Sequence, residues 1–216
     1  MLAIAALAAF AAIAEDVPEN GVMVRGDQFI SQWIARTSTV TGVDIGQGLS
    51  WLGAPVLAIV VVSVVVVLAM RKHWFRAWAV ALTCAGSVVL NQTLKFLFHR
   101  GRPEQAWKYV THDTWSFPSG HAMNSLACYG FLAYLLVEAT PIRSRKHAIV
   151  AATVVLVLLI GASRNYLNVH YVSDVVGGFL AGIAWLFVCI AAYTSTPRRV
   201  VATAAAAETD RDRQPR

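Results

Sequence analysis

Charged residues are scarce in this chain of 216 residues. They make up only 14% of it, whereas hydrophobic residues make up 57%. A soluble domain usually carries roughly 25% charged residues. So few charges exclude an ordinary soluble domain with a solvated surface, and they favour a protein embedded in lipid. The length suits a single domain, and the sequence shows no internal repeat and no separate soluble domain.

Cysteine is also rare, and no metal-binding pattern accompanies it. Cys84, Cys128 and Cys189 each lie within an apolar run, without CxxC or CxxH spacing. We interpret them as small buried hydrophobic residues. The sequence has no HExxH motif either, so it predicts no metal and no other cofactor.

Long apolar runs are what the chain has instead. Five of them approach or reach the roughly 17–25 residues with which a helix crosses a membrane. These runs are Ala54–Met70, Ala77–Phe98, His121–Val137, Ala148–Ser163 and Val175–Tyr193. A sixth run, Leu2–Ala14, is shorter; we interpret it as a short or truncated first span, and the alternative is a signal-peptide core without the usual basic flank. The sequence therefore predicts an all-α, six-helix membrane bundle.

Basic residues cluster in the connections on one side of this bundle. The clusters are Arg71, Lys72 and Arg76; Arg143, Arg145 and Lys146; and Arg198 and Arg199. With six spans all three clusters share one face, which the positive-inside rule makes cytoplasmic. The net charge of +6 thus reflects topology rather than nucleic-acid binding. We expect an inner-membrane domain over residues 1–197 and a flexible cytoplasmic tail over 198–216.

The connection Glu15–Gly53 falls on the opposite face. Within it apolar residues recur at roughly helical spacing, namely Phe29, Ile30, Trp33, Ile34 and Val40. This pattern predicts an amphipathic helix on the outer surface, between the first two spans. A plain connecting loop is the alternative.

Three separate segments bring polar and ionisable residues to this same outer level. The residues are Lys95, Arg102, Ser119, Gly120, His121, Arg164, His170 and Asp174. Ionisable groups at membrane depth are costly, so such a cluster predicts a functional site. Lys95, Arg102 and Arg164 can neutralise an anion with several oxygens. Ser119 and Gly120, at an expected helix start, offer backbone N–H groups.

The remaining residues suit attack on a phosphate. His170 and Asp174 are four residues apart, hence on one face of a helix that begins by His170. A carboxylate bonded to one imidazole nitrogen fixes the tautomer and leaves the other nitrogen free as a nucleophile. His121 can supply the proton that the leaving oxygen needs. Together these groups can transfer a phosphoryl group through a phosphohistidine.

Simpler explanations exist for single residues. The basic residues beside the spans could each anchor the chain at lipid headgroups; they are Lys95, Arg100, Arg102, Lys108 and Arg164. His121 could be a helix cap, and two histidines with an aspartate could bind zinc, although nearby cations would repel a metal. The convergence of three segments favours the phosphate site.

The same residues carry a family resemblance. Lys95–Pro103 reads KFLFHRGRP, Pro118–His121 reads PSGH, and Ser163–Asp174 reads SRNYLNVHYVSD. In order and without a gap, these resemble the motifs KxxxxxxRP, PSGH and SRxxxxxHxxxD of the type 2 phosphatidic acid phosphatases, or lipid phosphate phosphatases. The resemblance covers Val22–Tyr193.

The resemblance implies a six-helix core with its site on the outer side, and metal-free hydrolysis. It makes His170 the nucleophile, Asp174 its orienting partner and His121 the general acid. It assigns the phosphate to Lys95, Arg102, Ser119, Gly120 and Arg164. We expect a lipid phosphate or diphosphate substrate, with undecaprenyl diphosphate first and phosphatidylglycerophosphate or phosphatidate next. The alternatives are a lipid phosphotransferase, a vanadate-dependent halide oxidase and a non-catalytic lipid-binding or transport protein.

Overall fold

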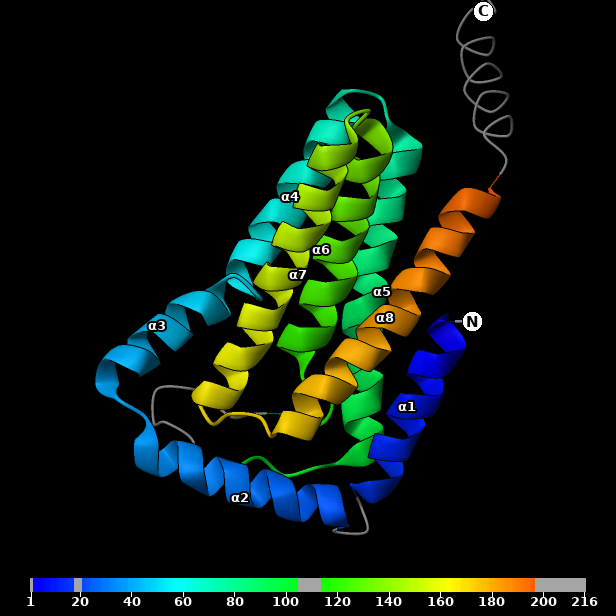
Figure 1. Cartoon of the computed structure of the whole chain (residues 1–216). Coiled ribbons are helices and arrows are strands. Elements are labelled where there is room, and N and C mark those ends of the chain that lie inside the picture. Colours follow the sequence, from blue (N-terminus) through cyan, green and yellow to red (C-terminus); the bar gives the residue numbers. More distant parts are fainter. Residues whose placement is uncertain (1, 18–20, 105–113, 197–216) are drawn as a thin grey trace, which may run out of the picture.

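The computed structural model describes residues 2–17, 21–104 and 114–196, and its regular elements are all α-helices (Figure 1). They are α1 (Leu2–Asp16), α2 (Val22–Thr37), α3 (Val40–Trp51), α4 (Pro55–Met70), α5 (Trp74–Phe98), α6 (Gly120–Ala139), α7 (Arg143–Tyr166) and α8 (Val172–Ser195). These residues contain no strand, so the predicted all-α class is confirmed.

Helices α4 to α8 run side by side as a bundle (Figure 1). The short helix α1 packs against α8, α2 crosses one end of the bundle, and α3 leads obliquely from α2 to α4. The α4–α5 and α6–α7 connections, which carry two of the predicted basic clusters, lie at the end away from α2 (Figure 1). Arg198 and Arg199 of the third cluster lie outside the described residues.

Five segments of the described chain are long and apolar enough to cross a membrane: α3 with α4, and each of α5 to α8. Every apolar run predicted as a span is therefore helical, and large apolar side chains such as Val62, Leu82 and Leu158 point outward, as lipid contact requires. Helix α1 has only 15 residues and is not among these segments, so the sixth span stays a prediction. Helix α3 was not expected.

One face of α5 is polar although it is buried in the bundle. Its residues are spaced four apart and therefore line up along the helix: Thr83, Ser87, Asn91 and Lys95. Ser87 Oγ donates to Asn124 Oδ1 at 2.7 Å, and Asn91 Nδ2 donates to the Pro118 carbonyl at 3.2 Å. Because unsatisfied polar groups are costly in a membrane protein, these bonds fix α5 against α6 and aim Lys95 at the segment before α6.

Glycines let α8 approach the start of α6 closely. A Cβ on Gly178 would lie 2.6 Å from the Ser119 carbonyl oxygen, and one on Gly182 would lie 2.9 Å from the Met123 carbonyl oxygen. Small residues four apart are a common means of tight helix packing in membranes. This close contact sets the PSGH segment beside the first turn of α8.

Helix α1 packs through aromatic rings near the same place. Phe10 stacks on the fully buried Phe117 with ring centroids 5.5 Å apart, and Phe98 meets Phe117 edge-on at 5.1 Å. Phe117 directly precedes PSGH. The run Leu2–Ala14 is thus part of the packed core of the described structure.

The connection Glu15–Gly53 contains helix α2, while its predicted place on the outer surface of a membrane stays a prediction. The helix turns Asp27 and Ser31 inward, where both are buried, and leaves Phe29 and Trp33 exposed. Its apolar face therefore points away from the protein. The helix ends at Thr37, so Val40 belongs to α3 rather than to this helix.

We predict that Gly178→Ala destabilises the protein by about 1–3 kcal/mol, because the added methyl group overpacks against backbone that cannot move aside. The melting temperature of the detergent-solubilised protein should fall. Gly26→Ala in α2, where an added Cβ meets nothing within 4 Å, is the matched control. Equal melting temperatures for the two variants would contradict the packing described.

Candidate active site

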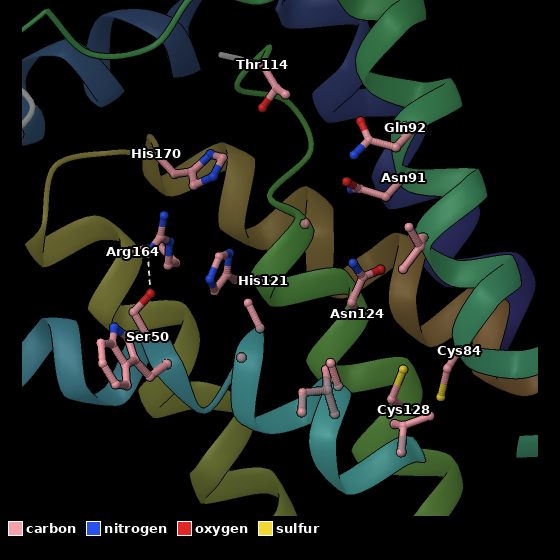
Figure 2. Close-up of a pocket in the computed structure, with 18 of the residues that line it drawn as sticks. Ser50, Cys84, Asn91, Gln92, Thr114, His121, Asn124, Cys128, Arg164 and His170 are labelled. Atoms are coloured by element: carbon pink, nitrogen blue, oxygen red, sulfur yellow. Dashed lines mark hydrogen bonds between the residues drawn. The ribbon is translucent and has the colours of Figure 1, made fainter. Parts of the chain in front are cut away.

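A cavity of about 760 Å³ opens among α3, α4, α5, α6 and the α7–α8 turn. Most of the predicted site residues line it, namely Lys95, Arg102, Gly120, His121, Arg164 and His170. No acidic side chain of the described residues lines it. Figure 2 shows His121, Arg164 and His170 around one open space, although they come from three different segments. An anion is the ligand that such a lining favours.

His170 is held by Asp174 as the spacing predicted, but not within a helix. Helix α8 begins only at Val172, so His170 lies in the turn before it. His170 Nδ1 is 3.5 Å from Asp174 Oδ2, and both side chains are buried. The backbone N–H of Tyr171 also donates to Asp174 Oδ2, at 2.8 Å, which anchors the carboxylate at the helix start.

Ser116 completes the support of the imidazole. Its hydroxyl donates to Asp174 Oδ2 and lies 3.3 Å from His170 Nδ1, which can donate to it in turn. This arrangement places the Nδ1 proton toward Asp174 and Ser116. The lone pair is then on Nε2, which is 3.3 Å from a guanidinium nitrogen of Arg102.

Burial lowers the pKa of His170 to about 3, although Asp174 acts in the opposite direction. The imidazole is therefore neutral at physiological pH. A neutral ring with its lone pair on Nε2 is the form that attacks phosphorus. The surroundings of His170 thus favour the neutral tautomer with its lone pair on Nε2.

Two of the cations are held by backbone carbonyl oxygens. Arg102 donates to the carbonyls of Val169 at 2.7 Å and Thr114 at 2.9 Å, which joins the segment before α6 to the nucleophile's turn. Lys95 Nζ donates to the carbonyl oxygens of Trp115 and Ser116. Burial lowers the pKa of Arg102, yet a guanidinium stays protonated. Both cations thus face the cavity from fixed positions.

Two buried polar atoms at the site have no hydrogen-bond partner among the described residues. They are Arg164 Nε and Ser119 Oγ. Arg164 is held by Ser50 of α3, whose hydroxyl accepts from the guanidinium (Figure 2). Because buried polar groups are normally paired, Arg164 Nε is a donor that an anion in the adjoining cavity could satisfy.

The backbone N–H groups that could bind an anion are only in part those of Ser119 and Gly120, which the sequence predicted. The Ser119 N–H is occupied, since it donates to the Asp174 carbonyl at 2.9 Å. Gly120 and His121 open α6, where the first N–H groups of a helix have no partner within it. The backbone donors for an anion are therefore those of Gly120 and His121, while Ser119 can contribute its hydroxyl.

The alternative that the basic residues are only headgroup anchors is wrong for three of them. Lys95, Arg100 and Arg164 are 5%, 8% and 6% exposed, so they point into the protein. Lys108 lies outside the described residues.

Some residues of the site escaped the sequence reasoning. They are Ser50, Asn91 and Ser116. Asn91 could have been found, because it lies one turn before Lys95 on the same face of an apolar helix. Ser50 and Ser116 carry no sequence signal of their own, since only the folded chain brings them to the motif residues. Arg100 lies within the motif segment Lys95–Pro103, but the sequence suggested for it only a role as headgroup anchor.

Geometry and sequence comparison agree on the class of protein. The model of the PAP2 superfamily matches residues 76–198, which include all three motifs. The chain belongs to this superfamily and is a multi-pass membrane lipid phosphatase.

Its relatives include enzymes of known name. Phosphatidylglycerophosphatase B of Bacillus subtilis (strain 168) is 35% identical over 147 residues, which are 67% of this chain and 71% of that protein. The crystal structure of a transmembrane PAP2-type phosphatidylglycerolphosphate phosphatase from Bacillus subtilis is similar with a TM-score of 0.82 and 29% identity, over 91% of this chain and 98% of that one. Aquifex aeolicus LpxE shares the fold, with a TM-score of 0.55 and 22% identity over 74% of this chain and 92% of its own.

We predict that Ser116→Ala lowers kcat about tenfold and leaves KM nearly unchanged, because it loosens the imidazole without touching the cations. Steady-state kinetics on a lipid phosphate in detergent micelles would measure this. Thr93→Ala removes an exposed hydroxyl from α5 and is the control. A wild-type kcat for Ser116→Ala would show that its bonds to Asp174 and His170 do not matter to turnover.

Proposed function

We propose that this protein removes the terminal phosphate of a membrane lipid through a phosphohistidine on His170, at the outer face of the cell membrane. The observation that carries this proposal is the position of His170, which lines a cavity together with Lys95, Arg102 and Arg164 and has its Nε2 3.3 Å from a guanidinium nitrogen of Arg102. A neutral nucleophile facing three cations suits a phosphate dianion, and it suits few other substrates.

The chemistry follows from the positions of these groups. His170 Nε2 attacks phosphorus, and the bond from phosphorus to the lipid oxygen breaks while His121 gives that oxygen its proton. Lys95, Arg102, Arg164 and the start of α6 stabilise the charge on the phosphoryl oxygens. Water, deprotonated by His121, then attacks the phosphohistidine and releases inorganic phosphate. Asp174 keeps the imidazole in one tautomer throughout.

No metal is required by this mechanism. Three fixed cations and the backbone N–H groups of α6 already supply the charge that a metal would bring to the phosphate. A divalent ion would also be repelled by Lys95, Arg102 and Arg164. Activity in the presence of a chelator is therefore expected.

The cavity also suits a lipid tail. Beyond the cations it continues between α4 and α5 along apolar residues, namely Leu57, Ala58, Val61, Val62 and Val88. We propose that the substrate enters laterally between these two helices. Phosphatidylglycerophosphate becomes the first candidate, since it is the substrate in the names of two relatives. Undecaprenyl diphosphate and phosphatidate have the same combination of phosphate and tail, and they remain candidate substrates to be assayed beside it.

We predict that the purified wild-type protein, in detergent with EDTA, releases phosphate from phosphatidylglycerophosphate faster than from undecaprenyl diphosphate or phosphatidate. His170→Ala should lower the rate by about 10⁴-fold or more, because the covalent route is lost. Asp174→Asn should retain some activity, since the nucleophile remains but its tautomer is no longer fixed. Phosphate is measured colorimetrically, and a mock-purified membrane extract is the control.

The other outcomes of this assay separate the rival functions. Full activity of His170→Ala would refute the phosphohistidine mechanism. Release only after addition of an acceptor lipid, with phosphate recovered on that lipid, would identify a phosphotransferase. Lipid binding without release from any substrate would favour a binding or transport protein, and halide oxidation without added vanadate would favour the oxidase.

We further propose the orientation that the basic connections favour. The ends bearing the Arg71 and Arg143 clusters would be cytoplasmic, and α2 with the active site would lie at the outer surface. Helix α1 would be a short sixth span. The exposed Phe29, Ile30 and Trp33 of α2 would rest in the lipid headgroup region.

We predict a signal from each of two reporter fusions in bacteria, which report opposite sides of the membrane. Alkaline phosphatase fused after Glu104, next to the site, should be active because this end is outside. Green fluorescent protein fused after Arg216 should fluoresce, because the tail is cytoplasmic. An inactive phosphatase fusion together with a dark fluorescent fusion would invert the proposed topology.

A further inference from the structure

Helix α2 carries a buried carboxylate that lies outside residues 76–198, the part of the chain that matches the superfamily. Asp27 is only 4% exposed. Its Oδ1 accepts the Ser173 backbone N–H at 3.0 Å, and its Oδ2 accepts the Ser173 hydroxyl and a guanidinium nitrogen of Arg100 at 2.8 Å. Helix α2 is thus hydrogen-bonded to the first turn of α8.

Arg100 connects this carboxylate to the catalytic one. One terminal nitrogen pairs with Asp27, and the other donates to Asp174 Oδ1 at 2.6 Å and to Ser173 Oγ at 2.7 Å. The guanidinium also lies 4.4 Å from the centre of the Tyr171 ring. Burial opposes its charge, but Asp174 and Asp27 together raise the pKa of Arg100. The group is a fixed cation between two carboxylates.

This bridge decides how Asp174 is oriented. Arg100 holds Oδ1, while Oδ2 receives Ser116 and the Tyr171 N–H and faces His170. Rotation of the carboxylate would exchange the two oxygens. Asp27 limits that rotation, because it fixes the second nitrogen of Arg100 and so keeps the guanidinium from shifting toward Asp174.

A second contact from α2 reaches the other side of the nucleophile. Ser31 Oγ donates to Asn168 Oδ1 at 2.8 Å, and Asn168 Nδ2 donates to the Ser31 carbonyl at 3.2 Å. Asn168 is two residues before His170 and has a positive φ of 54°. Helix α2 therefore holds the turn that bears His170 at both of its ends.

We infer that Asp27 is a positioning residue of the phosphatase, which acts on the nucleophile His170 through Arg100 and Asp174. The inference depends on the proposed function of the His170 site. It adds to the residues that support catalysis one from helix α2, which lies outside all three motifs.

The test separates positioning from general stability by kinetics in two backgrounds. Asp27→Asn keeps the side-chain shape but removes the charge, and we expect kcat to fall about 10- to 100-fold while KM changes less than about twofold. In an Asp174→Asn background the same change should cost less than about twofold, because residues that act as one unit are not additive. The probe is radiolabelled phosphatidylglycerophosphate in detergent micelles, or whichever lipid of the panel the wild type hydrolyses.

Two further variants make the result decisive. Asp44→Asn changes an exposed carboxylate of α3 and should behave as wild type. Ser173→Ala removes the hydroxyl between Asp27 and Arg100 but leaves both charges, and it should lower kcat about three- to tenfold with KM unchanged. It replaces Asp27→Asn in the comparison if that variant cannot be purified as a monodisperse protein.

The outcomes are distinct. A wild-type kcat for Asp27→Asn, or for Ser173→Ala where only that variant folds, overturns the inference and leaves the proposed function intact. Equal losses of kcat with and without Asp174→Asn also overturn it, since Asp27 would then act independently of Asp174. Inactivity of the wild type on every lipid phosphate instead removes the proposed function on which the inference depends.

Discussion

The side chain of Asp174 is withdrawn from water at the end of a membrane helix, where an ionised carboxylate is stable only if donors surround it. The fold supplies them from separate parts of the chain: Arg100 to one oxygen, and Ser116 with the Tyr171 N–H to the other. His170 faces the same oxygen. The hydrogen bonds that stabilise the buried Asp174 carboxylate are therefore the same ones that fix the position of the His170 imidazole.

The cations of the site are in the opposite situation, because they lack anionic partners among the described residues of the cavity. Lys95, Arg102 and Arg164 surround a cavity that no acidic residue of the described chain lines, and their mutual repulsion is relieved only in part by bonds to carbonyl and hydroxyl oxygens. A phosphate would replace these weaker partners and would also pair with the orphaned Arg164 Nε. If the proposed reaction takes place here, these cations would interact most strongly with the charge that develops on the phosphoryl oxygens in the transition state.

The sequence predicted what depends on composition and short spacing. Apolar runs located every helix that is long enough to cross a membrane, and three motifs located His170, His121 and the cations. It missed α3, because Gly42, Gly46 and Gly48 interrupt its apolar pattern; the first two instead allow contact with Tyr166 and Leu167. The partner of a motif residue could not be found in this way. Asp27 meets Ser173 across 146 positions, and nothing in either segment records that pairing.

This difference has a physical origin. The groups that touch phosphate must have particular chemistry, so they occupy fixed positions that a short pattern can capture. The groups that aim them need only the right distance and hydrogen-bonding capacity, which α2 and α3 supply from the edge of the bundle. Ser50 on α3 holds Arg164, and Asp27 on α2 holds Arg100. The residues of the three motifs therefore lie on or next to the long helices α5 to α8, whereas residues of α2 and α3 hold two of their cations in place.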